Sequence, residues 1–184
     1  MGFGLLILGV ALWWGAHLFK RFAPERRAAM GDKGKGLVAL GVFAGIALMV
    51  IGYRATDYIH VWSPPLFLVH VNNLLVLFAI YMMSPAPKKG VLLHKLRHPM
   101  LGGFKLWAFA HLLVNGDLAS IILFGGLLAW AVVEVIVINK SEPDWTPGPA
   151  GSLGKDAMFF AISIVLLAVI GYIHGWIGPW PFGG

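Results

Sequence analysis

The stretch LRHPMLGGFKLWAFAHLLVNGD, residues 96–117, decides the fold class. It begins with basic residues and a proline, continues as an apolar run and ends on Asn-Gly-Asp. Proline is well tolerated in the first turn of a helix, because the N–H that it lacks would have no partner there. The apolar run 99–115 is therefore predicted to be a helix whose length approaches the thickness of a bilayer. Its histidine, His111, lies far inside the run.

Five more apolar blocks of similar length follow the same pattern, and Pro, Gly and charged residues separate them. The six blocks are residues 2–20, 36–53, 64–83, 99–115, 117–139 and 156–174. The chain is 59% hydrophobic and 12% charged, which is about half the charge of a soluble domain. These features predict an all-α polytopic membrane protein, a bundle of six transmembrane helices that forms a single domain over residues 1–184. We see no internal repeat, and the tight Val-Asn-Gly-Asp connection predicts a hairpin of the fourth and fifth helices.

Lysine and arginine residues predict the orientation. Of the 14 such residues, 12 lie in the loops that follow the first, third and fifth blocks. The positive-inside rule places these loops in the cytoplasm, so both termini are predicted on the periplasmic side of the cytoplasmic (inner) membrane. Membrane lipid is the expected partner of this charge, and no cluster of basic and aromatic residues indicates nucleic-acid binding.

Residue types that are absent exclude several kinds of site. The chain has no cysteine, which excludes disulfides, thiolate-bound metals and covalently attached haem. No predicted helix carries the His-x-x-x-His or Glu-x-x-His pair with which helical bundles bind non-haem metals. Ionisable groups inside a membrane are costly and are therefore functional candidates, although Lys20, Lys105 and Glu134 lie near block ends and can reach the interface.

Three histidines lie within the apolar blocks, namely His17, His70 and His111. Each taken singly could equally be a packing residue held by a hydrogen bond. Three in one small bundle favour a metal or haem-iron site, because neutral imidazole binds iron without burying a charge. Asn115 lies one turn after His111 on the same helical face and offers the imidazole a polar partner.

Depth in the membrane distinguishes the possible pairs of ligands. Counting about 1.5 Å per residue from the block ends places His111 about 18 Å, His70 about 22 Å and His17 about 5 Å above the inner boundary. His70 and His111 are therefore expected to be almost level, whereas His17 is expected about 13 Å below His111.

The segments LRHPM (96–100) and GGFKLWAFAHLLVNGDLASIILFG (102–125) closely resemble the signature of the NnrU family of bacterial membrane proteins. The segments GAHLF, KRFAPERR and PPLFLVH agree with this resemblance. The family is associated with nitrogen-oxide metabolism in denitrifying bacteria. It is also similar to the plastid cis-zeta-carotene isomerase, a membrane protein that holds haem b through histidines.

The resemblance implies non-covalent haem b, with His17 and His111 at the positions of two isomerase histidines. Ala108 stands where the isomerase has a cysteine, and Trp130 stands where it has a later histidine. The resemblance therefore implies haem binding more directly than it implies isomerase activity.

Three classes of function stay open. The first is a haem protein, either an isomerase or a redox enzyme, that binds a small apolar or nitrogen-oxide ligand. The second is a membrane methyltransferase, because Arg97-His98-Pro99 resembles the turn with which isoprenylcysteine carboxyl methyltransferases bind S-adenosylmethionine; the same residues also suit a basic anchor at the start of a span. The third is a non-catalytic assembly factor or transporter. Substrate, redox partner and oligomeric state do not follow from the sequence.

Overall fold

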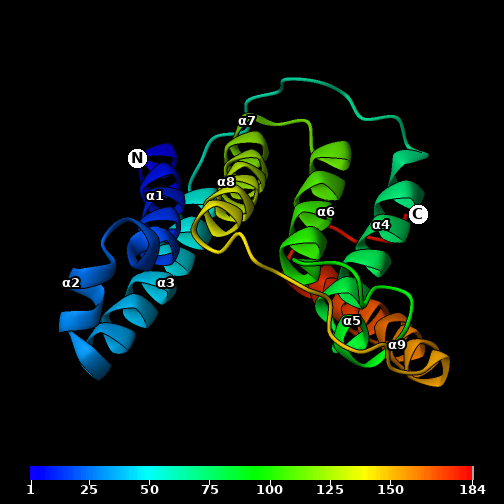
Figure 1. Cartoon of the computed structure of the whole chain (residues 1–184). Coiled ribbons are helices and arrows are strands. Elements are labelled where there is room, and N and C mark those ends of the chain that lie inside the picture. The colour runs from blue at the N-terminus through cyan, green and yellow to red at the C-terminus, as the bar shows by residue number, and fades with distance from the viewer. Residues whose placement is uncertain (184) are drawn as a thin grey trace. The chain divides into compact units, whose positions relative to one another are not determined.

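Figure 1 shows the computed structural model of the chain, which describes residues 1–183 as helices joined by loops. The chain divides into two compact units. One consists of Met1–Ser63 and Gly116–Pro143, and the other of Pro64–Asn115 and Asp144–Gly184. Each unit is assembled from two separate pieces of chain, so neither is a domain in sequence. The single domain over the whole chain stays a prediction.

The first unit is built on α1 (Gly2–Phe22) and α3 (Gly31–Arg54), which pack along each other (Figure 1). The short α2 (Pro24–Ala29) connects them. A third, continuous helix is composed of α7 (Leu118–Ser120), the π-helical segment η1 (Ile121–Gly125) and α8 (Gly126–Ser141). This helix packs on α1 through η1 and α8.

The second unit is built on α4 (Leu68–Met83), which packs against both α6 (Pro99–Val114) and α9 (Leu153–Ile177). The short α5 (Ala86–Lys89) follows α4 and packs against α9. The predicted hairpin of the fourth and fifth blocks would join the two units, so it stays a prediction. The fourth block, α6, packs on α4, and the fifth, α8, packs on α1.

Each of the six apolar blocks is a helix, which confirms the all-α class and the membrane-like composition. Four helices are long and apolar enough to cross a membrane, and they are Gly2–Phe22, Gly31–Arg54, Leu118–Ser141 and Leu153–Ile177. Helices α4 and α6 have 16 residues each. At about 1.5 Å per residue they are about 24 Å long, which is short of a hydrocarbon core of about 30 Å. The bundle of six transmembrane helices therefore stays a prediction.

The predicted block ends need correction where prolines and caps act. The block predicted over 64–83 becomes helical only at Leu68. Pro65 disfavours the helical conformation of Pro64, and the Leu68 amide donates to the Pro65 carbonyl in a turn at 3.0 Å. The block predicted over 156–174 is extended to Leu153–Ile177, and the Ser152 side chain accepts a hydrogen bond from the Lys155 amide at its start.

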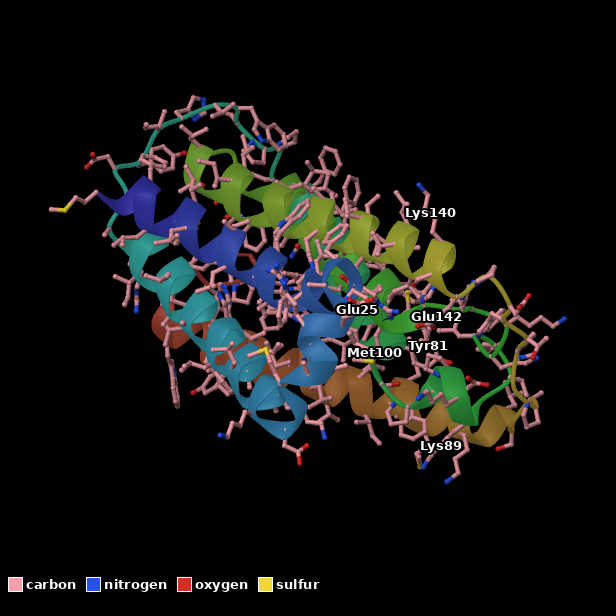
Figure 2. The ribbon with its side chains drawn as sticks, turned by 60° about the vertical axis from the view of Figure 1, so that its left-hand side comes forward. Glu25, Tyr81, Lys89, Met100, Lys140 and Glu142 are labelled. Atoms are coloured by element: carbon pink, nitrogen blue, oxygen red, sulfur yellow. The ribbon has the colours of Figure 1, made fainter. Side chains whose placement is uncertain are left out.

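A pair of charged side chains ties two helix ends together in the first unit. Figure 2 labels Lys140 and Glu142 at the C-terminal end of α8. In the first unit, Arg21 Nη1 lies 2.6 Å from Glu142 Oε1, so the end of α1 and the end of α8 meet. The side of the membrane on which these ends lie stays a prediction.

Candidate functional site

His111 lies near the C-terminal end of α6 and is half-buried. Its Nδ1 is 2.9 Å from the carbonyl oxygen of Trp107, one turn earlier, and its ring centroid is 4.9 Å from the Trp107 ring. A carbonyl oxygen only accepts, so Nδ1 carries the hydrogen and Nε2 carries the lone pair. This is the tautomer of a histidine that binds a metal through Nε2 while a backbone carbonyl orients the ring.

Asn115 has a local role in the structure. Its Nδ2 donates to the backbone carbonyl of His111 at 2.8 Å, and its own amide reaches the same carbonyl at 3.1 Å. The carbonyls in the last turn of a helix lack helical partners, so Asn115 caps α6. After Gly116, Asp117 begins the next helix by accepting a hydrogen bond from the Ser120 amide at 2.9 Å. The Asn-Gly-Asp segment therefore ends one helix and starts another.

His17 repeats the geometry of His111 in the first unit. Its Nδ1 is 2.9 Å from the Trp13 carbonyl oxygen, and its ring centroid is 4.1 Å from the Trp13 ring. Trp130 of α8 adds a second aromatic wall, with its ring centroid 4.7 Å from that of His17. Trp130 thus lies directly beside His17.

The two histidines belong to a short internal repeat, and the prediction of no repeat is wrong at this scale. Residues 9–18, GVALWWGAHL, and residues 103–112, GFKLWAFAHL, share the pattern Gly-x-x-Leu-Trp-x-x-Ala-His-Leu. One copy lies on α1 in the first unit and the other on α6 in the second. Each copy holds its histidine in the same way. We name this pattern the tryptophan–histidine repeat.

The glycine of each copy marks a close approach to the partner helix. A methyl group on Gly9 would lie 2.8 Å from the carbonyl oxygen of Gly45 and 2.8 Å from Met49 Cγ on α3. A methyl group on Gly103 would lie 2.7 Å from the carbonyl oxygen of Ala79 and 2.8 Å from Met83 Cγ on α4. In both units a glycine therefore packs on a small residue and on the methionine four positions later.

His70, the third candidate, is placed differently. It lies on α4 and is exposed, whereas Asn72 on the same helix is only 7% exposed. Asn72 Nδ2 donates to Asn73 Oδ1 at 3.1 Å, and Asn73 Nδ2 donates to the Pro181 carbonyl at 2.9 Å. The polar face of α4 therefore serves packing inside the second unit, and His70 is not part of it.

A buried carboxylate that the sequence interpretation missed organises the loop after α4. Asp156, near the start of α9, is only 2% exposed. Its Oδ1 accepts from the Tyr81 hydroxyl at 2.6 Å, and its Oδ2 accepts from the amides of Val91 at 2.6 Å and Leu92 at 3.3 Å. Gly90 passes so close to this carboxylate that any side chain there would collide with it. An acid at the start of a long apolar block was the available signal.

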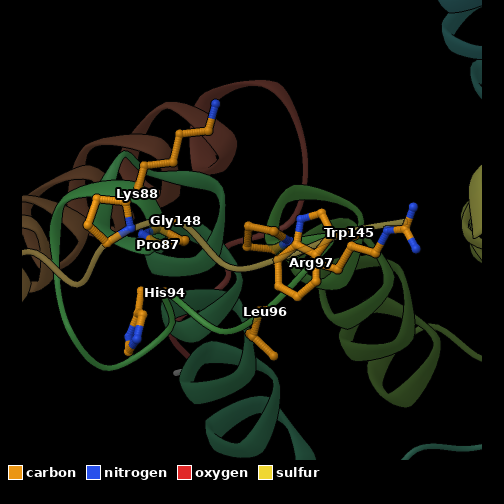
Figure 3. Close-up of a pocket in the computed structure, with 9 residues that line it drawn as sticks. Pro87, Lys88, His94, Leu96, Arg97, Trp145 and Gly148 are labelled. Atoms are coloured by element: carbon orange, nitrogen blue, oxygen red, sulfur yellow. The ribbon is translucent and has the colours of Figure 1, made fainter. Parts of the chain in front are cut away.

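The same loop borders a cavity of about 330 Å³ within the second unit, shown in Figure 3. Lys88 and His94 stand on one side of it and Arg97 on the other, with Leu96 and Trp145 between them (Figure 3). Its other lining residues are Pro87, Pro99, Gly148 and Pro149. The Arg-His-Pro turn thus contributes two residues to the wall of a cavity.

A family model described as NnrU protein matches residues 5–181. The chain belongs to the NnrU family. The match includes both copies of the tryptophan–histidine repeat, the Asp156 carboxylate and the cavity, so all of these are parts of the NnrU region. No curated protein and no solved structure matches the chain. Among residues 1–183 no three His, Asp or Glu side chains come together as a metal-binding group.

Proposed function

We propose that this NnrU protein binds haem b within the membrane, with His111 as an axial ligand through Nε2. The observation that carries the proposal is the shared geometry of His17 and His111, each with Nδ1 fixed by a backbone carbonyl and with an indole beside the ring. Histidines that bind metals commonly donate their other ring nitrogen to a carbonyl, which fixes the ring and raises the basicity of the ligand nitrogen.

The residues present fit this cofactor. Axial ligation of haem requires one or two nitrogen donors, so it does not need a group of three ligands. Neutral imidazoles on apolar helices satisfy this requirement without burying a charge. The chain has no cysteine for thioether bonds, and the haem would therefore be non-covalent.

The second ligand stays open between His17 and His70. Equivalence in the tryptophan–histidine repeat favours His17, as does the family resemblance. Depth along the predicted spans favours His70, but the exposed position of His70 supplies no ring-orienting contact comparable to those of His17 and His111.

When bound, haem supplies a site for nitrogen-oxide binding or for electron transfer. The reaction is proposed at the level of class, as a step in nitrogen-oxide metabolism or as a carotenoid-type cis–trans isomerisation. Around either ligand the chain would contribute indole walls and an apolar helix surface, which suit a small apolar or nitrogen-oxide molecule.

The visible spectrum of the purified full-length protein, produced with ample haem, tests this proposal. The wild type is expected to show the Soret band of a low-spin haem, and His111→Ala is expected to lose most of it while the protein still inserts. Replacing His17 or His70 should convert the iron to high spin only where the true second ligand is lost. His174→Ala is the matched control, because its Nδ1 also bonds a backbone carbonyl, that of Pro179 at 2.8 Å. A full low-spin spectrum from His111→Ala would refute the assignment.

The topology is part of the proposal. Six spans, with both termini on the periplasmic side of the bacterial inner membrane, explain why basic residues are concentrated in alternate loops. A reporter that is active only in the periplasm, fused to the C-terminus, should be active. If only a cytoplasmic reporter is active at the C-terminus, the predicted orientation is wrong.

A methyltransferase is the second candidate, and the observation that favours it is the cavity beside Arg97 and Pro99. None of the described residues that line this cavity is acidic, although an acidic side chain would suit the ribose hydroxyls of S-adenosylmethionine. Calorimetry with S-adenosylmethionine, on wild type and on Arg97→Gln, tests this candidate. Heat that Arg97→Gln abolishes would support it.

A further inference from the structure

The cavity beside the Arg-His-Pro turn has walls that are held in place from both sides. Residues 84–98 form one wall and residues 144–152 the other. Backbone hydrogen bonds join the two, from the Gly151 amide to the Gly90 carbonyl at 2.9 Å and from the Ser152 amide to the Lys89 carbonyl at 3.2 Å. The Asp156 carboxylate also holds the first wall, because it accepts hydrogen bonds from the amides of Val91 and Leu92. The cavity is therefore a built feature of the second unit.

The residues that line the cavity include Lys88 and Arg97 and none that is acidic, and the one acidic residue of the second wall, Asp144, is exposed. Residues 84–98 contain four lysine or arginine residues and no aspartate or glutamate. Asp156 is buried and already accepts three hydrogen bonds, so it does not neutralise a ligand in the cavity. His94 Nδ1 is held by the Val91 carbonyl at 2.6 Å, and Lys88 is exposed at the rim. This lining suits an anion.

In the proposed topology, in which α4 and α6 are spans, the cavity also lies at the level of the membrane surface. Pro99, in its wall, is the first residue of α6, and α4 ends at Met83 just before the loop that forms the cavity. Trp145, another wall residue, is 40% exposed and has the amphipathic character of residues at membrane–water interfaces. Lipid phosphates lie at this depth, and basic pockets at the cytoplasmic ends of helices bind anionic head groups.

We propose that this cavity binds the phosphate head group of an anionic phospholipid, with Lys88 and Arg97 as the cationic partners and Trp145 against the glycerol region. A volume of about 330 Å³ is at the lower end of the range for small-molecule pockets, about 300–1,000 Å³, which is enough for a head group. The acyl chains would extend along the apolar surface of the second unit. This site is independent of the haem assignment.

Native mass spectrometry of the full-length protein in detergent, titrated with phosphatidylglycerol or with phosphatidylcholine, tests the proposal. Phosphatidylglycerol is expected to bind more tightly, and the double variant Lys88→Gln/Arg97→Gln should weaken it by about fivefold per removed charge, or about 25-fold. The matched control is Arg26→Gln/Lys33→Gln, which removes the same two charges from exposed positions in the first unit.

A steric pair of variants tests the cavity itself without changing charge. Gly148 lines the cavity and has open space where a side chain would begin, so Gly148→Leu should fold and weaken phosphatidylglycerol binding. Gly154→Leu also enters open space but lies outside the lining, so it should bind as the wild type does. Far-UV circular dichroism of each variant confirms that it is folded.

Three results would overturn the proposal. The first is equal weakening by the control pair of charge variants, which would indicate a diffuse surface potential instead of a site. The second is unchanged lipid binding in Gly148→Leu. The third is complete displacement of the lipid by inorganic phosphate, or by S-adenosylmethionine in an Arg97-dependent way, because the occupant would then be a soluble ligand. None of these results depends on whether the protein shows a Soret band.

Discussion

Replacing Gly9 or Gly103 with alanine should destabilise the protein, although alanine is the better helix former. Both glycines lie where their helix approaches its partner closely. The added methyl group would lie within 2.8 Å of a backbone carbonyl oxygen in each case, and a carbonyl cannot turn aside as a flexible side chain can. The helices of each pair would have to separate.

Two opposing magnitudes determine the size of the effect. Inside a helix, alanine stabilises the folded state by about 0.5–1 kcal/mol relative to glycine. An extra methyl group in a packed interface destabilises it by about 1–3 kcal/mol. Gly15→Ala and Gly102→Ala are matched controls on the same two helices. Gly15 has open space at its Cβ position, and Gly102 would meet only the flexible end of Met82. The difference between each variant and its control isolates the clash and is expected to be about 1–3 kcal/mol.

Thermal unfolding in detergent, followed by circular dichroism at one scan rate, measures this difference. For a chain of this size about 1 kcal/mol corresponds to about 2–4 °C in Tm, so each clash variant should melt about 2–12 °C below its control. Similar losses for Gly9→Ala and Gly103→Ala would show that the two copies of the tryptophan–histidine repeat pack alike. If either variant melts as high as its control, the close approach at that glycine is wrong.

Three further variants test the polar contacts. Asp156→Asn should weaken the hydrogen bonds that the amides of Val91 and Leu92 donate to this side chain, and hydrogen exchange should show their protection lowered by about 2–4 kcal/mol. The control Asp144→Asn, at an exposed position, should leave their protection unchanged. Asn115→Ala should lower the free energy of unfolding by about 0.5–1.5 kcal/mol but keep the Soret band, and loss of the band would show that Asn115 orients the imidazole. Asp117→Ala should cost about 0.5–2 kcal/mol in thermal unfolding, because a helix cap is lost, and an unchanged Tm would contradict that cap.

The sequence predicts the helices well because each apolar block needs a hydrogen-bonded backbone within a membrane. Its errors lie at the ends of the blocks. Prolines at 64 and 65 delay the start of α4, and the Ser152 cap starts α9 early. Apolar composition alone does not determine which helix packs against which, and the pairing of α6 with α4 depends on the fit at Gly103.

The sequence predicts the candidate site only in part. His17 and His111 stand out as imidazoles in apolar blocks, and their carbonyl bonds follow from helical spacing alone. The contact between Trp130 and His17 joins residues more than a hundred positions apart and needs the packed structure. The repeat was visible in the sequence. The packing that accompanies it is not visible there, because the motif helix precedes its packing partner in the first unit and follows it in the second.

The recurring tryptophan requires its own explanation. Any residue at position 13 or 107 would supply the carbonyl oxygen to which the histidine bonds, since that oxygen belongs to the backbone. The hydrogen bond therefore does not account for an indole in both copies. The indole ring instead contacts the imidazole itself. The distance between the ring centroids is 4.1 Å at His17 and 4.9 Å at His111. A wall of this size restricts the ring and keeps water from one of its faces. A histidine that only packs between helices needs neither effect, whereas a neutral ligand nitrogen in an apolar site benefits from both.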